Sequence, residues 1–431
     1  MQWPSIRKSS LTIMQIGRQI KDPLYRNSLF LFASNTLSTG LGFCFWMVVA
    51  RFYAEDEVGL GAAIVSAASF LAMFSKLGLD FALIRFLPKA EKPVEMINSC
   101  FTLSGIVALA VAGIFVAGLD LWSPALGFIR GDAMFVLTFV LFAFGWTLSG
   151  MMDYIFIAKR RADLNLTKNT ISSLLKIPLP ILLVLFFRAF GIVSSWGIAI
   201  GVALAISLVF FLPRVQNGYH PVPRLNLGIV RYIWRYSLGS YLAELFAAGS
   251  TLILPIMVVN LLEAEQNAYF YVAWKIVGLL FAIPGAVSRS LFAEGSHYED
   301  ELRVNVRRSL GLVFLLLIPA AILLFLLGKW FLLLFGASYS ANALTLLRIL
   351  GLSSLFVGIN RIYYSILRVQ DRIRELATIC GMITLAVLLV SYFVMPTTGI
   401  VGIGYAWIAA QGVVSVYVLL VMKSSYLAKR S

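Results

Sequence analysis

Residues 213–228, Pro-Arg-Val-Gln-Asn-Gly-Tyr-His-Pro-Val-Pro-Arg-Leu-Asn-Leu-Gly, decide how the chain divides. The stretch carries three prolines, two arginines and two asparagines. Because proline lacks a backbone donor and glycine loosens the chain, we expect neither a buried helix nor a strand to cross it. A block of long apolar segments lies on each side, so the sequence predicts two halves of similar size.

The two blocks resemble each other weakly. Gly191–Val193 reads Gly-Ile-Val late in the first block, and the same tripeptide recurs as Gly399–Val401 late in the second. Tyr154 precedes a basic turn much as Tyr364 does. These offsets of about 208 to 210 residues favour an internal repeat, for which the matching helix pattern is the better support.

The composition is that of a membrane protein. Hydrophobic residues make up 60% of the chain and charged residues 13%, against about 25% charged in soluble domains. The net charge of +15 is spread over short loops, which fits anionic lipid headgroups and not nucleic acid. The cysteines, Cys44, Cys100 and Cys380, lie far apart in apolar runs, so we expect neither disulfides nor a metal site.

Twelve apolar runs have the ~20 residues that cross a bilayer as a helix. They are too long, and too little alternating, for the strands of a membrane barrel. We therefore predict an all-α membrane protein with helices at about 28–52, 58–79, 98–118, 133–157, 169–187, 191–212, 233–260, 266–289, 308–327, 342–367, 376–394 and 400–422.

Basic residues alternate strongly between successive loops. If the N-terminus is cytoplasmic, most of the 35 Lys and Arg residues fall on the cytoplasmic side. When residues just inside helix ends are counted with their loops, the other side holds only Arg51, Arg130, Arg188 and Lys329. This bias predicts a multi-pass protein of the cytoplasmic membrane with both termini in the cytoplasm.

The predicted organisation has five parts. A basic N-terminal segment (1–27), compatible with a helix in the membrane plane, precedes a six-helix bundle (28–213). A cytoplasmic linker (214–232) leads to a second six-helix bundle (233–422) and a cytoplasmic tail (423–431). An even number of helices per bundle gives both bundles the same orientation, so we expect parallel repeats that meet at a cleft.

Four stretches resemble the polysaccharide and oligosaccharide flippases of the multidrug/oligosaccharidyl-lipid/polysaccharide exporter superfamily. These stretches are Ala50–Gly59, Leu77–Pro88, Leu334–Leu344 and Gly399–Ala406, in the order and at the helices that this family would have. The number of helices differs from the lipid-linked peptidoglycan precursor flippases, which have two more. A proline often found after the eighth helix is also missing from Leu291–Glu294.

The resemblance implies two six-helix bundles (a MATE-like fold) around a central, often cationic cavity. It implies a transporter without enzymatic activity, which carries the sugar-diphosphate head of a polyprenyl lipid outward by alternating access. The implied substrate is a lipid-linked oligosaccharide. Glycosyltransferases and a polysaccharide polymerase are candidate partners, and coupling to H⁺ or Na⁺ stays open.

Charged side chains inside predicted helices mark the candidate site, because each costs at least ~2.5–3.5 kcal/mol at mid-bilayer. Glu244 and Lys275 fall near the midplane from opposite faces, at about 16 Å and 14 Å along antiparallel helices. Lys176 lies at middle depth and Arg361 in the inner part of its helix. The three cations are suited to a diphosphate; alternatively, Glu244 and Lys275 form an ion pair that only satisfies both.

Asn35, Ser38, Thr39 and Gly42 form a polar or small stripe at helical spacing. The stripe serves either helix packing or a sugar-facing cavity wall. Asp153, near a helix end, is expected to pair with Lys159 or Arg160.

Two other functions compete with a flippase. A drug/cation antiporter of the same superfamily needs embedded carboxylates, of which Glu244 is the central example. A membrane-embedded transferase or polymerase needs acidic or histidine residues gathered in outer loops, where Glu55–Glu57 stands without histidine. No nucleotide-binding P-loop pattern is present in the sequence.

Overall fold

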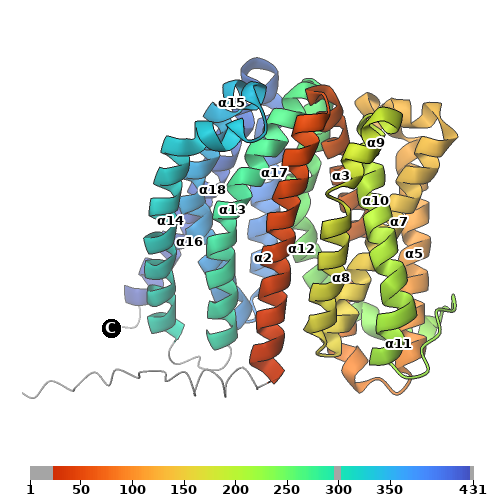
Figure 1. The fold of residues 1–431 in the computed structure, drawn as a ribbon. Coiled ribbons are helices and arrows are strands. Elements are labelled where there is room, and N and C mark those ends of the chain that lie inside the picture. The colour runs from red at the N-terminus through yellow and green to blue at the C-terminus, as the bar shows by residue number, and fades with distance from the viewer. Residues whose placement is uncertain (1–22, 296–301, 428–431) are drawn as a thin grey trace, which may run out of the picture.

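Long helices that run side by side make up the protein (Figure 1). The computed structural model describes residues 23–295 and 302–427, and these residues contain no strand. Eleven helices in this part of the chain are long and apolar enough to cross a membrane. The main helices are α2 (Pro23–Phe52), α3 (Glu55–Ser75), α5 (Pro93–Ala117), α7 (Ala133–Ala158), α10 (Ala189–Ile206), α12 (Leu227–Leu261), α13 (Ala264–Gly295), α14 (Leu302–Leu333), α16 (Leu344–Val369), α17 (Ile373–Thr398) and α18 (Val401–Leu427).

These helices confirm the predicted all-α membrane fold. Residues 1–22 lie outside the described part, and with them most of the segment expected to form an in-plane helix. We call the end of the bundle where α2 and α12 begin the basic end, and the other the opposite end.

The fifth predicted helix is broken in two. The expected single span at 169–187 is α8 (Ala162–Leu175) followed by α9 (Leu179–Phe187). Pro178 and Pro180 stand at the break, where two missing backbone donors and two rings oppose a continuous helix. Lys176, which caps α8, therefore lies at an interruption of the helix.

The proline-rich stretch is non-helical from Gln216 to Asn226, as predicted. It is tied to the start of α5: the Asn98 side chain donates to the His220 carbonyl at 3.0 Å, and the backbone N–H of Asn226 donates to Ser99 Oγ at 3.0 Å. The Asn226 side chain then caps α12 by accepting from the backbone N–H of Gly228 at 2.9 Å.

The two halves meet along α3, α12 and α13. At the opposite end, Asn267 Nδ2 donates to the Gly59 carbonyl at 2.7 Å. A Cβ atom at Gly59 would collide with the Ala264 carbonyl, so only glycine allows this approach. Nearer the basic end, Tyr241 donates to the Phe74 carbonyl at 3.0 Å.

A further contact between the halves joins α2 to the end of α14. Arg51 Nε donates to the Leu334 carbonyl at 2.9 Å, and its Nη2 donates to the Leu333 carbonyl at 2.7 Å. A cation at a helix C-terminus also interacts favourably with the helix dipole. The opposite end is thus closed by contacts from α2 and α3 to the second half.

Candidate substrate-binding pockets

Two polar pockets lie inside the molecule, one in each half. The first has a volume of about 190 Å³ and lies among α2, α7, α8 and α10. The second has a volume of about 220 Å³ and lies among α12, α13, α16, α17 and α18. Of the predicted site residues, Ser38 and Lys176 line the first pocket and Arg361 lines the second.

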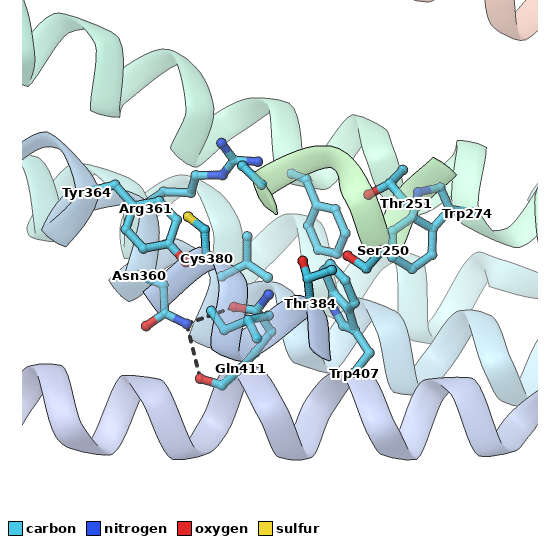
Figure 2. A pocket seen from close by; sticks show the side chains of 14 residues that line it. Ser250, Thr251, Trp274, Asn360, Arg361, Tyr364, Cys380, Thr384, Trp407 and Gln411 are labelled. Atoms are coloured by element: carbon cyan, nitrogen blue, oxygen red, sulfur yellow. Dashed lines mark hydrogen bonds between the residues drawn. The ribbon is translucent and has the colours of Figure 1, made fainter. Parts of the chain in front are cut away.

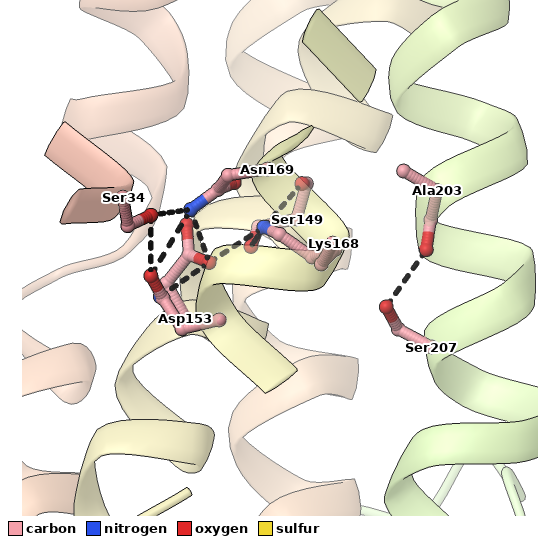
Figure 3. A network of polar contacts seen from close by, with 8 residues as sticks. Ser34, Ser149, Asp153, Lys168, Asn169, Ala203 and Ser207 are labelled. Atoms are coloured by element: carbon pink, nitrogen blue, oxygen red, sulfur yellow. Dashed lines mark hydrogen bonds and ion pairs between the residues drawn. The ribbon is translucent and has the colours of Figure 1, made fainter. Parts of the chain in front are cut away.

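A buried ion pair forms part of the first pocket (Figure 3). Lys168, only 1% exposed, lies 2.7 Å from Asp153 Oδ1. The same ammonium donates to the Ser149 carbonyl at 2.8 Å and to Ser149 Oγ at 2.9 Å. With three partners, the Lys168 charge is satisfied within the protein.

Asp153 is also the centre of a hydrogen-bond network. Asn165 donates to its Oδ1 at 2.8 Å and Asn169 donates to the same oxygen at 3.3 Å. Ser34 Oγ donates to Asn165 Oδ1 at 3.0 Å, which brings α2 into the network. The expected pairing of Asp153 with Lys159 or Arg160 is therefore wrong, since Asp153 faces α8. The spacing of Asn165, Lys168 and Asn169 on one helix face was the signal in the sequence that could have revealed this.

Lys176 has an aromatic environment in place of an acidic partner. Its ammonium lies 4.5 Å from the ring centre of Trp196 and 5.8 Å from that of Phe45, and the residue is only 9% exposed. Such faces attract a cation but leave its charge unneutralised.

Lys275 approaches Lys176 from the other half. Its ammonium lies 4.7 Å from the ring centre of Tyr271 on its own helix, α13. The Lys176 and Lys275 charges lie close enough to repel each other. Within the described residues, neither lysine takes part in an ion pair. The structure therefore brings together two cations that have no ion-pair partner among the described residues.

The expected ion pair between Glu244 and Lys275 does not form. The charges that act on Glu244 are those of Lys76, Asp80 and Arg368, and Lys76 binds Asp80 at 2.8 Å. The 1.5 Å rise per residue gives the depth of a side chain but not the direction in which it points around its helix. Equal depth on neighbouring helices was therefore insufficient to predict contact.

The second pocket combines one arginine with aromatic and amide groups (Figure 2). Arg361 and Tyr364 lie toward one end of the pocket, and Trp274 and Trp407 lie toward the other. The two indole rings meet edge to face at 4.8 Å. Asn360, on the Arg361 side of the pocket, donates through Nδ2 to Gln411 Oε1 at 2.7 Å. Indole faces and amides together suit a sugar, which has both apolar faces and hydroxyl groups.

Two further arginines lie near Arg361. Neither was predicted from the sequence to belong to the site. The Arg361 charge acts on Arg289 of α13 and on Arg368 of α16. Arg361 and Arg368 are seven residues apart, and therefore share one face of α16. This cluster adds positive charge beside the second pocket.

The polar stripe of α2 divides between pocket and surface. Ser38 lines the first pocket, whereas Asn35 and Thr39 are exposed. Thr39 Oγ1 donates back to the Asn35 carbonyl at 2.7 Å, within its own helix. Helix packing therefore does not account for these two residues.

The sequence is similar to proteins of polysaccharide biosynthesis and transport. The family model described as polysaccharide biosynthesis protein matches residues 48–341. A putative O-antigen transporter of Shigella flexneri is 27% identical over 168 residues, an alignment that spans 37% of this chain and 40% of that protein.

Solved structures show the same fold. An inward-facing multidrug resistance MATE family transporter of the MOP superfamily matches with a TM-score of 0.69 at 16% identity, over 93% of this chain and 99% of that one. The lipid II flippase MurJ, in an inward closed conformation, matches with a TM-score of 0.76 at 13% identity, over 92% of this chain and 87% of that one. By its family match, the chain belongs to the polysaccharide biosynthesis protein family, and it shares its fold with these two solved transporters.

Proposed function

We propose that the protein is a flippase that moves a polyprenyl-diphosphate-linked oligosaccharide across the cytoplasmic membrane by alternating access. One observation carries the proposal: Lys176 and Lys275 come from opposite halves close enough to repel each other, and within the described residues neither forms an ion pair. Holding two like charges together in a partly desolvated space is costly unless an anion joins them. A diphosphate supplies that anion, and it would draw the two halves together.

The groups of the second pocket extend the proposed site. Arg361, with Arg289 and Arg368 nearby, adds donors suited to phosphate oxygens. Trp274 and Trp407 offer the faces on which a sugar ring stacks. In this proposal the cations hold the diphosphate and the aromatic end of the pocket holds the first sugar.

The contacts at the opposite end indicate from which side of the membrane the substrate would enter. The Lys/Arg bias of the sequence favours an orientation with the basic end and both termini in the cytoplasm. With Arg51 and Asn267 closing the opposite end, the substrate would enter from the cytoplasmic side. Glycosyltransferases would supply it there, and a polysaccharide polymerase would use it after transport.

The antiporter alternative is less well supported. In the described residues, the Asp153 carboxylate is bound to Lys168 and Glu244 lies among Lys76, Asp80 and Arg368. Asp153 is therefore not a free carboxylate of the kind that an organic cation requires, and two cations already act on Glu244.

Binding of a synthetic polyprenyl-diphosphate-linked disaccharide to the full chain in nanodiscs tests the proposal. Arg361→Gln should raise the Kd at least about tenfold, because a hydrogen bond to a charged group contributes roughly 1.5–3 kcal/mol. Arg348→Gln, on the same helix but bonded to the Phe325 carbonyl, should leave the Kd unchanged. Equal affinity of both variants and the wild type would refute the assignment.

A further inference from the structure

A large apolar groove lies between α17 and α18 on the outer surface of the second half. Its volume is about 560 Å³. It runs from Glu375 to Val390 along α17, which corresponds to about 22 Å of helix. Met382 on α17 and Val413 on α18 line it with exposures of 53% and 71%. We call this feature the lateral groove.

The lateral groove and the second pocket share a wall. Ile383, 5% exposed, lines both. On α17, Cys380 and Thr384 face the pocket, whereas Ile379 and Met382 face the groove. On α18, Gln411 faces the pocket in the same way. The α17–α18 pair thus has a polar pocket on its inner side and an apolar groove on its outer side.

We infer that the lateral groove holds the polyprenyl chain of the substrate while the diphosphate is bound at the proposed site, with Arg361 of the second pocket among its cations. This inference rests on the proposed function. The head and tail of the substrate are covalently joined, so a chain leaving the pocket must pass into the bilayer. Ile383 is the side chain that separates the two spaces, and the junction of α17 and α18 is the exit.

The mouth of the groove offers no net positive charge that would hold the phosphate of a membrane phospholipid. Glu375 lines the groove in the first turn of α17, and Arg372 and Tyr363 are its partners. The ion pair with Arg372 neutralises the carboxylate, so a lipid phosphate in the groove would meet a charge pair that is already satisfied. The phosphates of a polyprenyl substrate would instead lie across Ile383, near Arg361.

The test measures binding of a tritiated long-chain polyprenyl diphosphate to the full chain in nanodiscs. Ala386→Trp fills the groove and should weaken binding about tenfold, since an indole displaces isoprene methylenes from their contacts. Leu385→Trp is the matched control: Leu385 adjoins Ala386, is 57% exposed and lies outside the groove. It should leave binding unchanged, and inorganic diphosphate should bind both variants like the wild type.

The results separate the two proposals. Wild-type binding that Ala386→Trp does not weaken would overturn the groove assignment alone. Failure of the wild type to bind polyprenyl diphosphate would overturn the proposed function and the groove with it.

Photolabelling supplies the independent measurement. An analogue with a diazirine on its terminal isoprene should label Met382 or Val413 well above Leu326 of α14, which is 66% exposed. Excess phosphatidylglycerol should not compete. If Met382 and Val413 are labelled no more than Leu326, or if excess phosphatidylglycerol abolishes their labelling, the groove is an ordinary lipid-facing surface.

Discussion

Lys168→Met should destabilise the first half of the molecule more than any other single charge removal that we consider. The Lys168 ammonium has three partners: Asp153 at 2.7 Å and the two oxygens of Ser149. Without it, the Asp153 carboxylate keeps only amide donors from Asn165 and Asn169. Breaking a buried ion pair costs ~3–5 kcal/mol. Asp153 is 25% exposed, so we expect about 3 kcal/mol, the lower end of that range.

The double variant Lys168→Met/Asp153→Asn isolates the interaction. Asparagine keeps an acceptor for Asn165 and removes the unpaired charge, so the double variant should recover most of the lost stability, roughly 2 kcal/mol. The assay is the melting temperature of purified protein in detergent, with Lys159→Met as the control. Two results would refute a stabilising ion pair. Either Lys168→Met melts at the same temperature as the wild type, or the double variant melts at no higher temperature than Lys168→Met.

Three further predictions concern how the halves meet and how the chain is oriented. Gly59→Leu should lower the melting temperature through a collision with the Ala264 carbonyl that costs about 1–3 kcal/mol, whereas Gly113→Leu, with open space around it, should not. Arg51→Gln should raise labelling of Cys44 by an impermeant thiol reagent severalfold, because the bonds to Leu333 and Leu334 are lost; Arg130→Gln, whose partner Asp120 is in the same half, should not. Cysteines at Glu57 and Glu263 should react from outside intact cells, those at Asp163 and Gly218 should not, and the reverse pattern would invert the orientation.

The helices could be predicted from the sequence because each apolar run matches the bilayer thickness. Eleven of the predicted spans correspond to helices of membrane length within residues 23–295 and 302–427. The exception, at 169–187, contains Pro178 and Pro180, and hydrophobicity alone does not report what two close prolines do to a helix.

The candidate site was harder to predict than the fold. Lys176, Lys275 and Arg361 were identifiable because a charge inside an apolar run is costly. The neighbours of each charged residue depend on how its helix is rotated about its axis and packed against other helices. The hydrophobicity of a segment does not specify either. Glu244 therefore has neighbours other than the expected one, and Lys168 went unnoticed because it follows a polar loop near a helix start.

Flipping by the full chain in proteoliposomes tests the central claim, that Lys176 and Lys275 together bind the substrate diphosphate. A fluorescent polyprenyl-diphosphate-linked disaccharide is placed in both leaflets, and its loss to a membrane-impermeant quencher is followed over time. Lys176→Gln and Lys275→Gln should each slow flipping at least about tenfold, while Lys176→Arg keeps the charge and most of the rate. Both glutamine variants flipping at the wild-type rate, at equal protein abundance, would contradict the account.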